Sequence, residues 1–164
     1  MPHARWLVAL PFMVLLGLLA GCRAPAREAQ PGISSARTDV VEERWPNGVW
    51  RLRKEVLRNP DGTTVDQGAH TRWYDNGQVE YQATFVHGQV DGVATSYHRN
   101  GQKAIEQHFA NGVRQGPRYN WDDQGRLRKE EHFVDDKPDG TWTAWDAEGK
   151  IEGQQHFEHG APKS

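Results

Sequence analysis

The chain has 164 residues, of which 26% are charged, and its formal net charge is −2. It lacks the strong basic excess typical of nucleic-acid-binding proteins, so we expect no nucleic-acid partner. Cys22 is the only cysteine, which excludes an intramolecular disulfide.

Residues 1–21 have the pattern of a secretory signal. Met1–Arg5 is basic, and Trp6–Leu19 is apolar apart from two residues. Such a core is too short to span a membrane as a helix. The sequence Leu-Ala-Gly-Cys that ends at Cys22 resembles the lipobox read by the lipoprotein signal peptidase. This resemblance implies cleavage before Cys22 and lipidation of that cysteine.

The lipobox predicts a protein of the cell envelope that is anchored to a membrane by the lipid on Cys22. An uncleaved membrane anchor is the alternative. Arg23 follows the cysteine, where an aspartate would signal retention in the inner membrane of enteric bacteria. By that resemblance we favour the periplasmic face of the outer membrane. Residues 22–43 are rich in Pro, Gly and Ser, which predicts a flexible linker after the lipidated cysteine.

From residue 68 onward the chain repeats every 24 residues. Four columns define the period: Gly68, Gly92, Gly116 and Gly140; Gly77, Gly101, Gly125 and Gly149; Trp73, Tyr97, Trp121 and Trp145; and Phe85, Phe109, Phe133 and Phe157. We expect a repeat domain over 44–164, with a weak repeat at 44–67 and repeats at 68–91, 92–115, 116–139 and 140–164.

Each repeat is predicted to be a β-hairpin. Asp75-Asn76-Gly77 has the composition of a three-residue loop closed by a left-handed glycine. That loop places Trp73 opposite Val79 and Thr71 opposite Tyr81. The corresponding pairs are Tyr97 with Lys103, Trp121 with Leu127, and Trp145 with Ile151.

In this register both aromatic rows lie on one face of the sheet, and Trp142 lies on the opposite, polar face. The strand Ile151–Phe157 would be a free edge that charged residues protect. No segment after the signal has a helical period that could cover the apolar face. The fold class is therefore all-β, an elongated single-layer antiparallel meander of hairpins.

The unit Tyr74–Gly92, with its Asn-Gly, His-Gly and Asp-Gly pairs, resembles the variant MORN repeat. The resemblance covers about 45–160. It implies an interaction or membrane-associated module, and some bacterial relatives are described as toxin–antitoxin antitoxins. A lipobox departs from a cytosolic antitoxin.

Three polar features are candidate chemical sites. The column of His108, His132 and His156, with Glu106 and Glu130, could hold a metal, but equivalent positions lie roughly 9–10 Å apart, which favours a solvated face. The acidic loop Val134–Gly140 lacks the ligand pattern of a calcium loop. No serine lies in a nucleophile elbow. We therefore expect no metal, no cofactor, no small-molecule substrate and no enzymatic activity.

The aromatic rows are the candidate binding surface, because rows of repeats form extended surfaces rather than clefts. The candidate residues are Trp73, Tyr97, Trp121, Trp142, Trp145, Phe85, Phe109, Phe133 and Phe157. The leading hypothesis is a non-catalytic structural or protein-interaction module with an unidentified protein partner. The alternatives are an antitoxin-like or immunity-like protein, a glycan- or lipid-binding module, and a hydrolase of envelope polymers that uses Glu106, Glu130 and His132.

Overall fold

The computed structural model describes residues 36–164. The expected signal peptide, the lipidation residue Cys22 and the first part of the expected linker lie outside this range. Within 36–164, no helix is long and apolar enough to cross a membrane.

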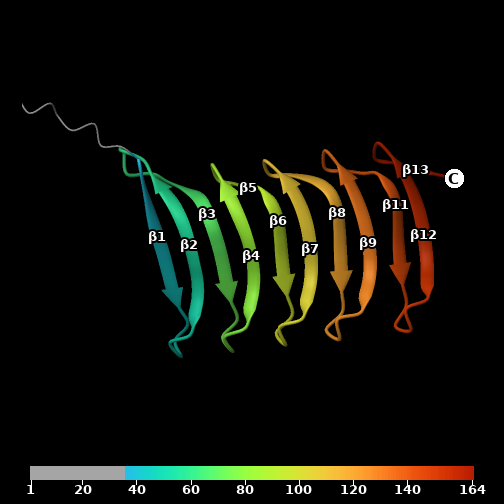
Figure 1. The fold of residues 1–164 in the computed structure, drawn as a ribbon, viewed down its shortest axis with the longest axis horizontal. Coiled ribbons are helices and arrows are strands. Elements are labelled where there is room, and N and C mark those ends of the chain that lie inside the picture. The colour runs from blue at the N-terminus through green and yellow to red at the C-terminus, as the bar shows by residue number, and fades with distance from the viewer. Residues whose placement is uncertain (1–35) are drawn as a thin grey trace, which may run out of the picture. The chain divides into compact units, whose positions relative to one another are not determined.

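The described residues form one antiparallel sheet of 13 strands (Figure 1). Eleven strands follow one another in chain order, and the short strands β5 and β10 lie off this path and pair with β4 and β9. The strands are β1 (Arg37–Arg44), β2 (Trp50–Arg58), β3 (Thr64–Trp73), β4 (Val79–Val86), β5 (Gln89–Val90), β6 (Gly92–Tyr97), β7 (Lys103–Ala110), β8 (Val113–Trp121), β9 (Leu127–Val134), β10 (Lys137–Pro138), β11 (Gly140–Trp145), β12 (Ile151–Glu158) and β13 (Ala161–Lys163). The predicted all-β, single-layer meander of hairpins is confirmed.

The hairpins close through the three-residue loop that the sequence predicts. The amide of Tyr74 donates to the carbonyl of Gln78 at 2.9 Å, so Asp75, Asn76 and Gly77 form the loop. Gly77 has a φ of 85°, a left-handed conformation that glycine adopts without a steric penalty. The side chain of Asn76 accepts a hydrogen bond from the amide of Gln78, which fixes the loop.

A β-bulge follows each of the four repeated loops and changes the register. Trp73 lies opposite Val79, as expected, whereas Thr71 lies opposite Gln82 rather than Tyr81. The expected pairs Tyr97–Lys103, Trp121–Leu127 and Trp145–Ile151 are confirmed, and each is followed by the same shift. The extra residues are Glu80, Ala104, Arg128 and Glu152. One added residue in a strand turns every later side chain to the other face.

The bulge separates the two aromatic rows. Trp142 and Trp145 are three residues apart in β11, so they point to opposite faces. The ring of Trp142 contacts Phe133 and Phe157, with centroids 5.3 and 4.6 Å apart. The expectation that both aromatic rows share one face is therefore wrong, as is the placement of Trp142 on the polar face.

Both ends of the sheet differ from expectation. Strand β1 pairs with β2, so the sheet begins inside the segment 22–43 that was expected to be linker. The segment was hard to recognise as a strand because five of its eight residues, RTDVVEER, are charged. At the other end, β13 pairs with His156–Glu158, so the expected free edge of β12 is covered over its last residues.

Two-residue turns join the hairpins at the opposite end of the strands. His87 and Gly88 both have positive φ, 49° and 81°, as a type I′ turn requires. Asp136 replaces the glycine in one of these turns and has a φ of 65°. Its carboxylate accepts hydrogen bonds from the backbone amide and the guanidinium of Arg114, at 3.0 and 2.9 Å. These bonds hold a non-glycine residue in a left-handed conformation.

Candidate functional site

The sheet presents two different surfaces. We call the side that carries Phe85 the Phe face and the side that carries Trp73 the Trp face. On the Phe face lie Phe85, Phe109, Phe133, Phe157 and Trp142, and on the Trp face lie Trp73, Tyr97, Trp121 and Trp145. The structure thus divides the nine-residue candidate binding surface between two sides of the sheet.

Between its phenylalanines, the Phe face changes from repeat to repeat. One column holds His70, Ala94, Arg118 and Trp142, and its cross-strand partners are Ala83, Gln107, Glu131 and Gln155. The Trp face varies less, since histidine recurs at His108, His132 and His156. A surface with a constant frame and varied central side chains offers different chemistry along its length.

A buried carboxylate lies at the centre of the Phe face. The side chain of Glu131 is only 4% exposed, and it pairs with Arg118 at 3.1 Å and with Lys129 at 2.6 Å. Asn120 donates a third hydrogen bond at 3.4 Å. Because two cations share one carboxylate, the cluster has one positive charge in excess. The side chains of Arg118 and Lys129 are 32% and 44% exposed, so that charge is accessible.

Two hollows lie along the Phe face. The first has a volume of about 360 Å³, reaches from β4 to β8 and has Arg118 at its border. The second has a volume of about 270 Å³, reaches from β9 to β12 and has Lys129 at its border. Apolar side chains contribute to both: Tyr81, Ala94, Ile105 and Phe109 line the first, and Trp142, Ala144 and Phe157 line the second. The Arg118–Glu131–Lys129 cluster therefore lies between two partly apolar hollows.

Gly153 opens the second hollow. Unlike the other glycines of residues 36–164, it does not have a positive φ, and a Cβ atom at this position would meet no atom within 4 Å. The equivalent positions of the earlier repeats hold Tyr81, Ile105 and Lys129. Neither backbone conformation nor crowding requires a glycine here, and its absent side chain leaves space beside Trp142.

The wall of this hollow is an aromatic stack. Trp142 lies between Phe133 and Phe157, and its indole nitrogen donates to the carbonyl of His132 at 3.0 Å. Phe133 is buried, with 3% of its surface exposed. The guanidinium of Arg114 lies 4.3 Å from the ring centroid of Phe133 and covers it. The aromatic part of the surface is therefore ordered before any partner binds.

His70 occupies the corresponding place in the second hairpin. Its ring lies 5.1 Å from Phe85 and 6.0 Å from Tyr81, centroid to centroid. Burial lowers the pKa of His70 below its usual 6.5, and the nearby Asp66 carboxylate opposes part of this shift. Both ring nitrogens are buried without a hydrogen-bond partner in residues 36–164. A neutral imidazole therefore packs here as an aromatic ring.

The histidines of the Trp face form separate contacts with acidic residues. His132 lies 3.0 Å from Glu130, and His108 lies 3.9 Å from Glu106. His156 contacts the hydroxyl of Thr141 instead. Among residues 36–164, no three His, Cys, Asp or Glu side chains form a group that could hold a metal ion.

A ladder of side-chain hydrogen bonds joins the loops of successive hairpins. The amide of Asn76 donates to the carbonyl of Arg99 at 2.8 Å, and Asn47 donates likewise to Asp75 at 2.7 Å. Tyr74 donates its hydroxyl to the carbonyl of Tyr97 at 2.7 Å. In these bonds the donors belong to the earlier repeat and the acceptors are carbonyls of the later one, so the bonds to carbonyls have one direction along the array. Arg99 donates in the opposite direction, to the carboxylate of Asp75.

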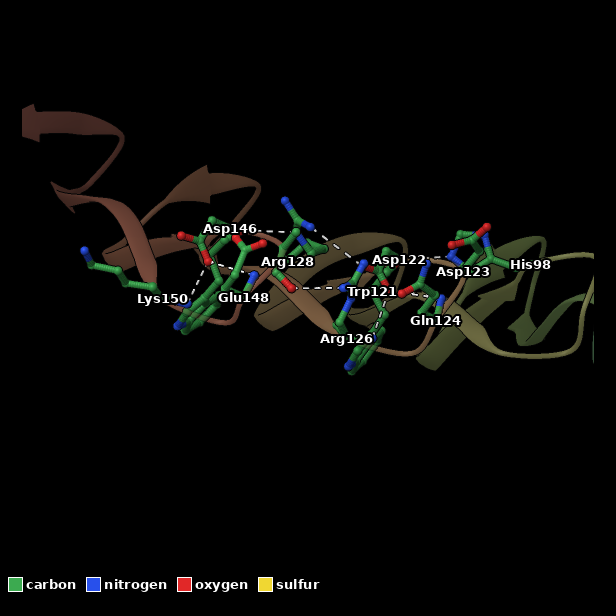
Figure 2. A network of polar contacts seen from close by, with 12 residues as sticks. His98, Trp121, Asp122, Asp123, Gln124, Arg126, Arg128, Asp146, Glu148 and Lys150 are labelled. Atoms are coloured by element: carbon green, nitrogen blue, oxygen red, sulfur yellow. Dashed lines mark hydrogen bonds and ion pairs between the residues drawn. The ribbon is translucent and has the colours of Figure 1, made fainter.

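Two arginines preserve this ladder where the repeat sequence changes. Asp122 and Gln124 replace the aromatic residue and the asparagine of the earlier loops. In their place, Arg126 donates to the carbonyl of Ala147 and Arg128 to that of Trp145, each at 3.0 Å. Figure 2 shows both arginines extending from one loop to the next, with Asp122 beside them. The loop of the third repeat, whose sequence departs from the repeat pattern, therefore keeps the contact to the next loop through different donor residues.

Sequence reasoning missed the central cluster of the Phe face. Arg118, Lys129 and Glu131 occupy columns in which the residue type differs between repeats, so a search for recurring residues passes over them. The sequence signal that could have revealed the cluster is the variation of residue type at fixed positions of an otherwise regular repeat.

The MORN repeat variant family model matches three segments of the chain, residues 66–87, 90–111 and 138–159. Each segment includes the loop and most of the strands of one hairpin. The hairpin in which Arg126 and Arg128 replace the usual donors lies between the second and third segments. No curated protein matches the chain.

Proposed function

We propose that this protein is a non-catalytic interaction module of the cell envelope, anchored to a membrane through a lipid on Cys22, that binds a protein partner along its Phe face. The observation that carries the proposal is the pattern of this face, in which a constant phenylalanine row frames side chains that differ between repeats. MORN repeats in three hairpins are consistent with an interaction role.

The Phe face has the features of a recognition surface. Aromatic and arginine side chains dominate the binding energy of protein interfaces, and both types lie together here. Phe133, Trp142 and Phe157 contact one another, and Arg118 is fixed by Glu131. Side chains that are ordered before binding lose little conformational entropy when a partner docks.

Two adjacent residues provide a matched test of the binding face. Gln154 and Gln155 are both exposed in β12 but point to the Trp face and the Phe face, respectively. A photo-crosslinking amino acid at residue 155 is expected to give a discrete adduct in cells, whereas the same group at residue 154 gives none. Adducts from residue 154 alone, or from neither residue, would contradict the proposal.

Anchoring requires its own test, because Cys22 lies outside the described residues. Metabolic labelling with palmitate is expected to mark the wild-type chain and not Cys22→Ser. Globomycin, which blocks lipoprotein signal cleavage, should cause the precursor to accumulate. Palmitate incorporation into Cys22→Ser would reject the anchor, and sucrose-gradient separation of the two membranes would test the outer-membrane assignment.

A further inference from the structure

We propose that the Phe face recognises an extended segment of a protein partner in which one acidic residue lies between two apolar residues. The carboxylate binds between Arg118 and Lys129, and the apolar side chains enter the two hollows on either side. This inference rests on the proposed function, since it specifies the partner chemistry of the same face.

The charges of the two faces differ in sign. In the regular strand positions from β6 to β12, the Phe face carries Arg114, Arg118, Lys129 and Glu131, and the Trp face carries Lys103, Lys137, Glu106, Glu130 and Glu158. The Phe face therefore has a net positive charge and the Trp face a net negative one. Charge complementarity favours an acidic partner on the Phe face and disfavours it on the Trp face.

The charge excess is concentrated at one place. Glu131 accepts from both Arg118 and Lys129, at 3.1 and 2.6 Å, so a single carboxylate balances two cations. A second carboxylate, supplied by the partner, would complete the pairing. The two cations are already held about their shared anion, so binding does not require them to be ordered. Hydrogen bonds between ionised groups are stronger than neutral ones.

The positions of the two hollows determine how far the apolar side chains of the partner segment lie from each other and from its acidic residue. Their centres are three to four strand spacings apart, or roughly 14–20 Å at 4.7–4.9 Å per strand. An extended chain covers 3.3–3.6 Å per residue, so about five residues separate the two apolar side chains. The acidic residue lies between them, opposite Arg118 and Lys129, which border the two hollows.

Gly153 gives the second hollow its specificity. A glycine within a strand weakens the strand, yet this one has neither a positive φ nor a close neighbour that excludes a side chain. The space that it leaves is lined mainly by carbon atoms of Trp142, Ala144 and Phe157. An aliphatic or aromatic side chain of the partner fits this space, and a larger residue at position 153 would fill it.

A random twelve-residue peptide library displayed on phage tests the inference directly. The bait is the full-length chain carrying Cys22→Ser. We expect enriched peptides to share an acidic residue with apolar residues on both sides. Synthetic versions of these peptides should bind Gly153→Leu about tenfold more weakly, the factor that corresponds to 1.4 kcal/mol. Lys129→Gln should weaken them about threefold, as expected for a partly exposed ion pair.

Thr141→Leu is the matched control. It introduces the same side chain into the same hairpin, but at an exposed position on the Trp face. Its peptide affinity should equal that of the wild type, and circular dichroism should show that Gly153→Leu remains folded. If Gly153→Leu does not fold, the peptide affinity of Lys129→Gln tests the inference in its place. The inference would be overturned if no peptides were enriched, or if the enriched peptides were basic or uncharged. It would also be overturned if the peptides bound Gly153→Leu, or Lys129→Gln where Gly153→Leu does not fold, as tightly as they bind the wild type.

The two proposals fail in different ways. If residue 155 gives adducts in cells but the library selects no acidic peptides, the recognition rule is wrong and the proposed function stands. If residue 155 gives no adducts, the proposed function itself is rejected.

Discussion

Replacing Trp142 with alanine should destabilise the last hairpin strongly, although the sequence predicted this residue to lie on the polar face as part of the candidate binding surface. Removing a fully buried tryptophan costs about 3–5 kcal/mol, and Trp142 is half-buried. Its ring contacts with Phe133 and Phe157 add about 1 kcal/mol. Its hydrogen bond to the carbonyl of His132 adds about 1 kcal/mol. Taking half of the burial cost, we expect Trp142→Ala to lose about 3.5–4.5 kcal/mol.

Amide hydrogen exchange is the appropriate measurement, because each repeat contacts only its neighbours and the loss will be local. Exchange in β11 and β12 should accelerate by about a hundredfold or more, while β3 and β4 change little. Trp142→Phe keeps an aromatic ring in the stack and should lose only about 1 kcal/mol. Unchanged exchange in β12 of Trp142→Ala would show that the aromatic stack does not support the hairpin.

Three further substitutions probe other contacts, each through its urea-unfolding midpoint. Glu131→Gln leaves two half-exposed cations without their anion and should cost about 2 kcal/mol; a gain would contradict the described pairing. Asp136→Gly should cost about 1 kcal/mol, because the lost bonds from Arg114 outweigh the relief at positive φ; a higher midpoint would refute this. Since burial lowers the pKa of His70, the unfolded chain binds more protons, and stability falls as pH decreases from about 6.5 through the folded-state value. His70→Phe should flatten this pH dependence, and an unchanged slope would exclude His70 as its source.

The sequence was sufficient to predict the repeat period, the hairpins and the length of their loops. The spacing of Gly77 and its equivalents fixed the turn, and the pairing of Trp73 with Val79 followed from it. The bulge was not predictable, because the inserted positions hold Glu80, Ala104, Arg128 and Glu152, which share no chemical property. One unrecognised residue per hairpin reversed the predicted face of every later side chain.

The candidate site was only partly predictable for the same reason. Phe133 and Trp142 were both selected from the sequence, but on opposite faces, so their contact was not foreseen. The cluster around Glu131 depends on pairing between β8 and β9, where the bulge decides which side chains meet. Residue types alone could not reveal that Glu131 is buried between two cations.

The direction of the loop ladder limits how the array can grow. Internal hairpins carry donors for the following loop and acceptors for the preceding one, so an internal duplication brings a complete set of contacts with it. In the last loop, three of the four positions that donate in earlier loops hold Asp146, Glu148 and Glu152, whose carboxylates only accept. Asp146 uses its side chain to bond the amides of its own loop. A hairpin appended after this loop would therefore find carboxylates at three of the four positions where earlier loops provide hydrogen-bond donors, and Lys150 would be the remaining donor.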